Sequence, residues 1–193
     1  MARSSGPWIA LPLLAAALLA WVGMATLSVA ALALSMFMVA FHRDPDRVPQ
    51  GEGMVSPADG LVMEATAANL AIFMNHHNVH VNRSPLAGRV ERVEHSDGGH
   101  RAAFFRSSSE NERNLIVMKT PEGEVRLVQI TGFVVRRIVC YVRPGDLVDR
   151  GERIGMIRFG SRVELSIPPG YGLRVAVGDR VRAGETVVAT RVK

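Results

Sequence analysis

The sequence has very little cysteine or lysine and few aromatic residues, and each shortage argues against a class of protein. The one cysteine, Cys140, lies in the apolar run RRIVCYV, so no internal disulfide can form and nothing indicates a cysteine metal site. The two lysines, Lys119 and Lys193, do not lie where a lipoyl or biotinyl carrier has its acceptor lysine. Because aromatic residues make up 6% of the chain and no basic helix is evident, nucleic-acid binding is disfavoured.

Charged side chains are absent from residues 7–41. A single helix over this run would be about 52 Å long, whereas the hydrocarbon core of a bilayer is about 30 Å thick. We therefore expect two shorter apolar helices, near residues 8–22 and 24–41, with a turn around Gly23. This membrane helix or hairpin would make residues 1–42 a membrane-anchoring hydrophobic segment.

The charges on both sides of the apolar run are positive. Arg3 precedes the run, and Arg43 and Arg47 follow it. Since positive charge favours the cytoplasmic side, we expect a cell-membrane protein whose main domain lies on the cytoplasmic face. There Arg43 and Arg47 would interact with anionic lipid. A secretory signal peptide is the alternative, but the apolar run is longer than such a peptide needs.

Residues 43–193 consist of short alternating runs of apolar and polar residues, separated by glycine, proline, asparagine and aspartate. This pattern predicts a mainly β (β-rich α+β) domain of about 150 residues, which is large enough for a hydrophobic core. One helix is possible near residues 66–74. The net charge of +5 comes almost wholly from arginine, which suits recognition of phosphate and carboxylate and therefore fits an anionic lipid.

An internal repeat lies in the C-terminal part of the chain. Residues 145–152, GDLVDRGE, recur as residues 178–185, GDRVRAGE. Each copy has the pattern of a turn, a strand and a second turn. Such paired half-motifs resemble those of biotinyl/lipoyl-like domains and predict a barrel-sandwich-hybrid-like core. The alternative is two similar hairpins without functional meaning.

The tetrapeptide Phe159-Gly160-Ser161-Arg162 contains a candidate self-cleavage bond. The Ser161 hydroxyl can attack the Gly160 carbonyl and move the acyl group from nitrogen to oxygen, and glycine tolerates the distorted backbone that this requires. Elimination of the resulting ester would leave an N-terminal pyruvoyl group, whose carbonyl can form a Schiff base with an amine. The alternative is an ordinary Gly-Ser turn.

Three histidines lie close together in the run NHHNVHV. His76 and His80 share a face in a helix or a strand, but no acidic or cysteine partner is near, so we predict no metal. Histidine also suits acid–base chemistry near neutral pH, and any of the three could instead be a hydrogen-bonded structural residue. In an extended segment His77 and His80 point to opposite faces and would do different jobs.

Asp59 lies in the turn SPADG, where it could be an ordinary turn residue or could orient a histidine that acts as a base on a serine. Asp59, His80 and Ser161 together would serve either a pyruvoyl enzyme or a membrane-anchored serine hydrolase. The hydrolase is disfavoured because the tetrapeptide lacks the second glycine of a G-x-S-x-G elbow. A non-catalytic barrel-sandwich adaptor would need none of the three residues.

In their order along the chain, six blocks resemble the phosphatidylserine decarboxylase family, and most closely its short, archaeal-type branch. The blocks are FHRDPDRVP, SPADGLV, HHNVHVNRSPLAG, GFVVRRIVCYV, PGDLVDRGERIGMIRFGSRVELSIP and VGDRVRAGETVVA. The resemblance covers nearly all of residues 41–193. It implies a catalytic domain over residues 43–193 that decarboxylates phosphatidylserine to phosphatidylethanolamine in phospholipid biosynthesis.

The resemblance also implies how the enzyme would mature. The proenzyme would cut itself between Gly160 and Ser161 into a long β chain and a short α chain that stay associated, and Ser161 would become the covalent pyruvoyl cofactor. A Ser-His-Asp arrangement of Ser161, His80 and Asp59 would drive the cut. The second histidine of the block, His77, would act in decarboxylation. The β chain would be residues 1–160 and the α chain residues 161–193.

The implied substrate is an anionic phospholipid whose serine amine condenses with the pyruvoyl carbonyl, which then takes up electrons as carbon dioxide leaves. Phe133 could line the mouth of the site toward the bilayer, and Arg136 and Arg137 could face the lipid phosphate. A strand with one solvated and one salt-bridged arginine is the alternative. Because β domains rich in edges often dimerise, a homodimer is possible.

Overall fold

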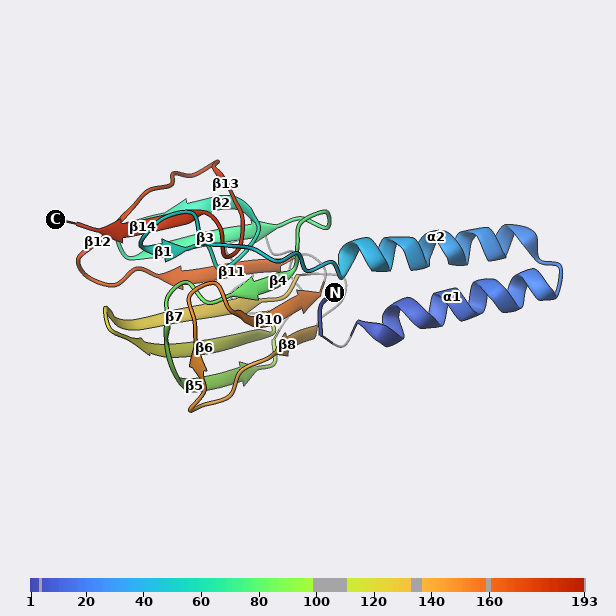
Figure 1. Cartoon of the computed structure of the whole chain (residues 1–193), viewed down its shortest axis with the longest axis horizontal. Coiled ribbons are helices and arrows are strands. Elements are labelled where there is room, and N and C mark those ends of the chain that lie inside the picture. Colours follow the sequence, from blue (N-terminus) through green and yellow to red (C-terminus); the bar gives the residue numbers. More distant parts are fainter. Residues whose placement is uncertain (4, 99–110, 133–136, 159–160, 193) are drawn as a thin grey trace. The chain divides into compact units, whose positions relative to one another are not determined.

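The computed structural model describes residues 1–193 apart from residues 4, 99–110, 133–136, 159–160 and 193. In the described part, two helices precede a β-rich region (Figure 1). The elements are α1 (Gly6–Trp21), α2 (Ala25–Phe41), β1 (Met54–Val55), β2 (Gly60–Ala65), β3 (Asn69–Met74), β4 (Val81–Arg83), β5 (Gly88–Ser96), β6 (Arg113–Thr120), β7 (Gly123–Ile130), β8 (Arg137–Cys140), β9 (Leu147–Val148), β10 (Arg153–Arg158), β11 (Ser161–Ser166), β12 (Tyr171–Leu173), β13 (Arg180–Val181) and β14 (Val187–Arg191). The prediction of a mainly β protein is confirmed.

The chain divides into two compact units, Met1–Pro45 and Asp46–Lys193. The first unit is a helical hairpin, in which α1 and α2 are linked by hydrogen bonds from serine hydroxyls to backbone carbonyls. The Ser28 hydroxyl donates to α1 at 2.8 Å and the Ser35 hydroxyl does so at 3.1 Å. Gly23 forms the turn with a φ of +79°, a conformation that favours glycine, so the predicted break is confirmed.

Most side chains of α1 and α2 are apolar, and many of the large ones are exposed within this unit. Neither of these helices, nor any other helix within the described residues, combines the length and the apolar character needed to cross a membrane.

The second unit, as far as it is described, contains three antiparallel sheets (Figure 1). The largest has eight strands in the order β13-β2-β3-β11-β7-β6-β5-β9, and the two smaller sheets have the orders β1-β14-β12 and β4-β10-β8. Strand β11 lies inside the large sheet, paired with β3 on one side and with β7 on the other. The strand that follows residues 159–160 is therefore built into the middle of the large sheet.

The expectation of a helix near residues 66–74 is wrong, because Asn69–Met74 forms strand β3. This strand pairs with both β2 and β11, so most of its side chains are buried. A strand buried on both faces reads as a short continuous apolar run, here NLAIFM, and such a run has no period that separates a strand from a helix.

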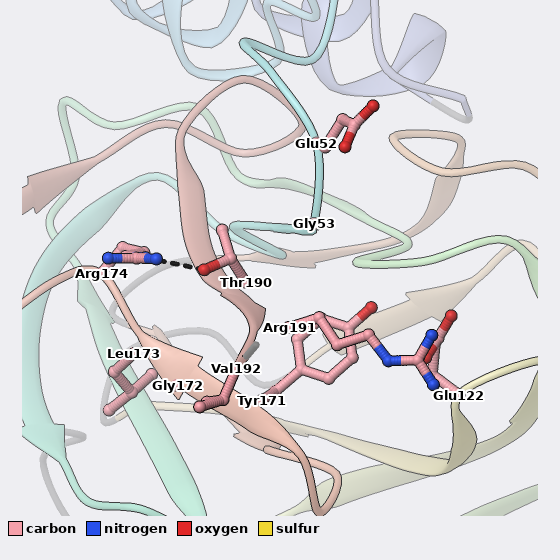
Figure 2. A pocket seen from close by; sticks show the side chains of 10 residues that line it. All are labelled: Glu52, Gly53, Glu122, Tyr171, Gly172, Leu173, Arg174, Thr190, Arg191 and Val192. Carbon is pink, nitrogen blue, oxygen red and sulfur yellow. Dashed lines mark hydrogen bonds and ion pairs between the residues drawn. The ribbon is translucent and has the colours of Figure 1, made fainter.

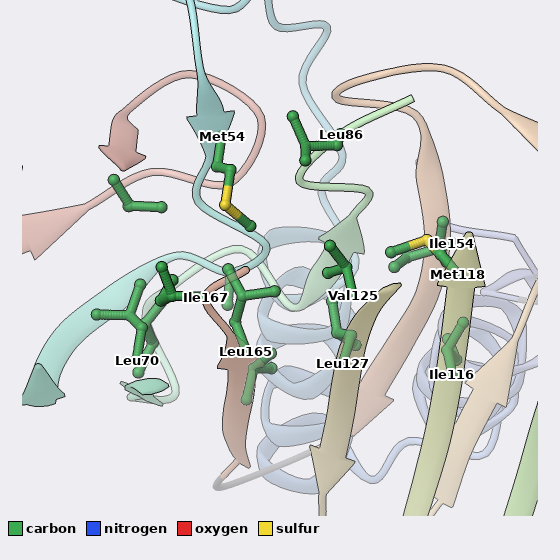
Figure 3. Close-up of a cluster of buried hydrophobic side chains, with 14 of the residues drawn as sticks. Met54, Leu70, Leu86, Ile116, Met118, Val125, Leu127, Ile154, Leu165 and Ile167 are labelled. Carbon is green, nitrogen blue, oxygen red and sulfur yellow. The ribbon is translucent and has the colours of Figure 1, made fainter. Parts of the chain in front are cut away.

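Hydrophobic side chains from all three sheets meet in one core (Figure 3). Its members include five side chains that are at most 1% exposed: Met54 of β1, Leu70 of β3, Leu127 of β7, Ile154 of β10 and Leu165 of β11. Full burial of one such side chain contributes roughly 1.5–3 kcal/mol. The core therefore holds the strand that begins at the predicted cleavage serine.

The sequence repeat makes equivalent contacts in its two copies. Residues 145–146 form two backbone hydrogen bonds with Val90, both 2.8 Å long, and residues 178–179 form the same two bonds with Val62, both 2.9 Å long. The repeat extends beyond residues 145–152 and 178–185. The segment SPADG from Ser56 recurs as SPLAG from Ser84, and each serine carbonyl accepts a hydrogen bond at 2.8 Å from the second glycine of one repeat copy.

Candidate functional site

Ser161 is the first residue of β11, and its side chain is fully buried. Met74, at the end of β3, lies directly opposite in the ladder, and directly opposed residues face the same side of a sheet. The Ser161 hydroxyl oxygen has no hydrogen-bond partner among the described residues. A buried polar atom without a partner is costly and calls for a functional explanation. Gly160, on the other side of the predicted scissile bond, lies outside the described residues.

The strands on either side of residues 159–160 pair with the strands on either side of the histidine block. Strand β11, after the break, pairs with β3, whereas β10, before the break, pairs with β4. The segment that joins β3 to β4, residues 75–80, contains the three histidines. The predicted scissile bond thus lies between β10 and β11, and the histidine block lies between their partners, β4 and β3.

His80 lies at the inner end of this segment and is fully buried. Its ring nitrogen Nδ1 is 2.9 Å from the carbonyl oxygen of Asn78. Because a carbonyl oxygen only accepts, Nδ1 carries the hydrogen, and in a neutral imidazole Nε2 is then the basic nitrogen. The carbonyl of His80 in turn accepts a hydrogen bond at 3.2 Å from the backbone N–H of Ile157, in the strand that precedes the predicted scissile bond.

Asp59 is buried, and both of its carboxylate oxygens accept hydrogen bonds. Oδ1 accepts from Arg47 and, at 2.8 Å, from the backbone N–H of Ala183. Oδ2 accepts from Arg47 at 3.0 Å and from the backbone N–H of Val79 at 3.3 Å. Within the described residues, Asp59 thus reaches His80 through the backbone of the preceding residue, with no hydrogen bond to its ring.

Arg47 is a site residue that the sequence did not reveal. The expectation that its side chain faces anionic lipid is corrected, because that side chain is 7% exposed and is bound to Asp59 and to the carbonyl of Ala183. In the sequence, a basic residue in a linker after an apolar run fits a contact with lipid as well as it fits a buried ion pair. Only the packing of the SPADG turn against the second repeat copy reveals its partner.

His77 is exposed, unlike His80, and lines a cavity of about 580 Å³. Its ring meets the ring of His76 edge to face, with 5.4 Å between the centroids. Arg180 and Arg182, from the second repeat copy, line the same cavity, as does Asp59. The cavity therefore brings an exposed histidine together with two guanidinium groups, which suits an anionic ligand. Arg180 and Arg182 were not predicted as site residues.

Of the predicted substrate-binding residues, Phe133 and Arg136 lie outside the described residues. Arg137 is exposed at the start of β8, directly opposite Arg158 of β10. Burial lowers the pKa of the Arg158 guanidinium, and the positive charge of Arg137 lowers it further. Two like charges opposite each other in a ladder repel, so an anion near them would be stabilised.

A larger cavity, of about 840 Å³, lies at β12 and β14 (Figure 2). Its lining includes Tyr171, Arg174 and Arg191, and the Arg174 guanidinium donates to the hydroxyl of Thr190 at 2.7 Å. The described lining contains none of the four predicted catalytic residues. The volume of a cavity alone therefore does not identify the candidate active site. The described residues also contain no cluster of three or more histidine, cysteine, aspartate or glutamate side chains that could hold a metal ion.

Comparison with known proteins shows the family of this chain. Residues 34–189 match the family described as phosphatidylserine decarboxylase. A putative archaetidylserine decarboxylase proenzyme of Methanococcoides burtonii is 49% identical over 162 residues, which cover 83% of this chain and 78% of the relative. The phosphatidylserine decarboxylase proenzyme of Thermobifida fusca is 48% identical over 197 residues, covering 96% of this chain and 90% of the relative.

A third relative, a putative archaetidylserine decarboxylase proenzyme of Methanosarcina acetivorans, is 42% identical over 200 residues, covering 98% of this chain and 96% of the relative. Relatives with both names thus align with nearly the whole chain. The resemblance seen in the sequence blocks is confirmed, and the chain belongs to the phosphatidylserine decarboxylase family.

Proposed function

We propose that this chain is a self-cleaving proenzyme that decarboxylates phosphatidylserine to phosphatidylethanolamine in phospholipid biosynthesis. Membership of the family supports the reaction class. The observation that carries the proposal for this chain is the buried Ser161 hydroxyl, which has no hydrogen-bond partner among the described residues and begins the strand beside the histidine block. A hydroxyl that makes no structural hydrogen bond is explained if it reacts, and the precursor of a pyruvoyl group is such a reactive hydroxyl.

In the self-cleavage step, the Ser161 hydroxyl oxygen attacks the carbonyl carbon of Gly160 while His80 Nε2 takes the hydroxyl proton. The peptide C–N bond then breaks, its nitrogen gains a proton, and an ester joins the two halves. Removal of the Cα proton of Ser161 expels Gly160 as a carboxylate. The Cα=Cβ double bond that this leaves takes up a proton at Cβ to give an imine. Water then replaces its nitrogen, which leaves as ammonia, and the pyruvoyl carbonyl is formed.

We infer that the two product chains stay associated because of how the strands are interleaved. The α chain, residues 161–193, would contain β11, β12, β13 and β14. Of these, β11 pairs with β3 and β7, β13 pairs with β2, and β14 pairs with β1. The hydrogen bonds of these ladders, and the packing of Leu165 in the core, would persist after the loss of one peptide bond.

The pyruvoyl group would supply an electrophilic carbonyl for the serine amine of the lipid and a sink for the electron pair left by carbon dioxide. We assign the headgroup to the cavity of His77. Arg180 and Arg182 there would hold the phosphate or carboxylate, and His77 would donate a proton to the carbon that loses the carboxylate. Arg137 and Arg158 form a second cationic position on the strands β8 and β10.

We further infer that the helical hairpin attaches the enzyme to the cytoplasmic face of the cell membrane. The uncharged run and the exposed apolar side chains of α1 and α2, such as Leu14, Trp21 and Met36, support contact with lipid. The equivalent contacts of the two repeat copies likewise support a barrel-sandwich-hybrid-like core in the second unit.

The test uses the full chain with vesicles that contain phosphatidylserine labelled at its carboxyl carbon. Wild-type protein is expected to release labelled carbon dioxide and form phosphatidylethanolamine, and Ser161→Ala is expected to do neither. Ser166→Ala, a change of the other serine of β11, is the matched control and should retain activity. A wild type that cuts itself but releases no carbon dioxide would contradict the substrate assignment, whereas an uncut wild type would contradict the maturation.

A further inference from the structure

Arg47 binds both carboxylate oxygens of Asp59. We propose that Arg47 is a positioning residue of the self-cleavage reaction, and that it acts through Asp59 on the backbone that carries His80. The proposal rests on the function proposed above, and it adds to that function a residue that holds the reacting groups in place without touching them.

The contacts form a continuous clamp between four segments of the chain. Arg47 donates to Asp59 through two nitrogens and also donates to the carbonyl oxygen of Ala183 at 3.0 Å. Asp59 uses its remaining acceptor positions for the backbone N–H groups of Ala183 and Val79. All four groups are buried. The side chains of Arg47 and Asp59 are 7% and 9% exposed, Val79 is 3% exposed and Ala183 is fully buried.

The internal repeat shows that the turn itself does not need this clamp. The segment SPADG has its counterpart in SPLAG, where Ala87 occupies the position of Asp59. Both turns form the same backbone hydrogen bond with a glycine of the repeat, Gly184 in one case and Gly151 in the other. The turn with Ala87 therefore folds without a carboxylate, whereas the carboxylate of Asp59 binds the N–H of Val79 in the histidine segment.

A buried carboxylate is tolerated only when cations and N–H donors compensate its charge. Arg47 supplies the cation in a planar bidentate geometry that also fixes the direction of the carboxylate. The carboxylate can then hold the N–H of Val79, the residue directly before His80. Because a displacement of about 1 Å at a reacting group can slow a reaction about 100-fold, this indirect contact is sufficient to control the cut.

The clamp also joins the two product chains. Arg47, Asp59 and Val79 would belong to the β chain, whereas Ala183 would belong to the α chain and is bound through both its N–H and its carbonyl. The clamp would therefore hold the histidine segment against the second repeat copy both before and after the cut.

The test measures the rate of self-cleavage of newly synthesised full-length chain in a cell-free system, by following the loss of the uncut band over time. Arg47→Gln and Asp59→Asn are each expected to slow the cut about 100-fold. The double variant should be about as slow as Asp59→Asn alone, because the proposed effect of Arg47 on the His80 segment passes through that carboxylate. Arg47→Lys should recover part of the rate, since its ammonium can replace only part of the bidentate contact.

The matched control is the neighbouring ion pair of Asp46 and Arg153, which is 2.7 Å long and whose Asp46 side chain is 98% exposed. Asp46→Asn and Arg153→Gln should cut at the wild-type rate. A purely structural role of Arg47 is checked in a Ser161→Ala background, where Arg47→Gln should leave the chain folded at the assay temperature by circular dichroism.

Three results would overturn the proposal: wild-type cutting by Arg47→Gln, effects of Arg47→Gln and Asp59→Asn that multiply in the double variant, or unfolding of the uncut Arg47→Gln chain. Any of these with a normally cutting wild type would leave the proposed function intact. A wild-type chain that does not cut would overturn both proposals.

Discussion

The backbone N–H of Ile157 donates a hydrogen bond to the carbonyl of His80, with 3.2 Å between nitrogen and oxygen. This bond ties a fully buried histidine to the strand that leads into the predicted scissile bond. The contact uses backbone atoms of both residues. A substitution of His80 can therefore remove the imidazole while residue 80 keeps this hydrogen bond.

His80→Ala should therefore abolish maturation. General-base catalysis by a positioned histidine contributes about 10²- to 10⁴-fold, so the variant should remain a single chain on the time scale in which the wild type is cut. Denaturing gel electrophoresis of freshly synthesised protein measures this. His76→Ala is the control, because that histidine is exposed and belongs to the same segment. Normal cutting by His80→Ala would remove the histidine from the mechanism.

His77→Gln should separate the two reactions. His77 is exposed in the cavity of about 580 Å³ and not buried beside β10, so the variant is expected to cut normally. Its turnover of phosphatidylserine should fall about 10²- to 10⁴-fold because the proton donor is missing. Carbon dioxide release by the purified, fully cut variant measures the effect. The assignment would be wrong if this enzyme kept wild-type turnover or if the chain stayed uncut.

Neutral substitutions of Arg180 and Arg182 should weaken binding of the lipid headgroup. Loss of one charge-assisted hydrogen bond is worth about 1.5 kcal/mol or more, so the double change to glutamine should raise KM about tenfold or more. The measurement is a vesicle assay at varied phosphatidylserine content with the cut enzyme. Arg174→Gln, in the larger cavity, is the matched control. An equal rise in KM for both enzymes would contradict the choice of cavity.

Gly155→Ala should destabilise the β-rich unit. A Cβ at this position would lie 2.8 Å from the side-chain nitrogen of Gln129 and 2.9 Å from the carbonyl oxygen of Val139. Overpacking of this kind costs about 1–3 kcal/mol. Urea unfolding in a Ser161→Ala background would measure the free energy of unfolding. Gly172→Ala should cost less, because its new Cβ would meet only a side-chain methyl of Val192 at 3.1 Å.

Much of the fold could be read from the sequence because its signals are local. Alternating runs predicted the strands, the glycine in the apolar run predicted the break at Gly23, and the repeated GD-x-V pattern predicted two equivalent segments of a turn, a strand and a second turn. The segment 66–74 was misread because β3 lies between two strands and is buried on both sides, which removes the alternation that marks a strand.

The site was only partly predictable. The family resemblance assigned Ser161, His80, Asp59 and His77, but it did not show that Asp59 binds the backbone beside His80. The pairing with Arg47 could not be predicted, since it depends on how a linker packs against a turn and against the second repeat copy. Charge pattern alone gives no partner for an arginine, because a lipid phosphate and a buried carboxylate satisfy it equally well.

The most direct test of the account is the intact mass of the purified protein under denaturing conditions, measured beside Ser161→Ala. The wild type is expected to separate into residues 1–160 and residues 161–193, with the shorter chain lighter by one ammonia than its unmodified sequence. The variant should stay whole. A wild type that stays a single chain of 193 residues in a membrane-like environment would contradict the account and would favour a serine hydrolase or a non-catalytic adaptor.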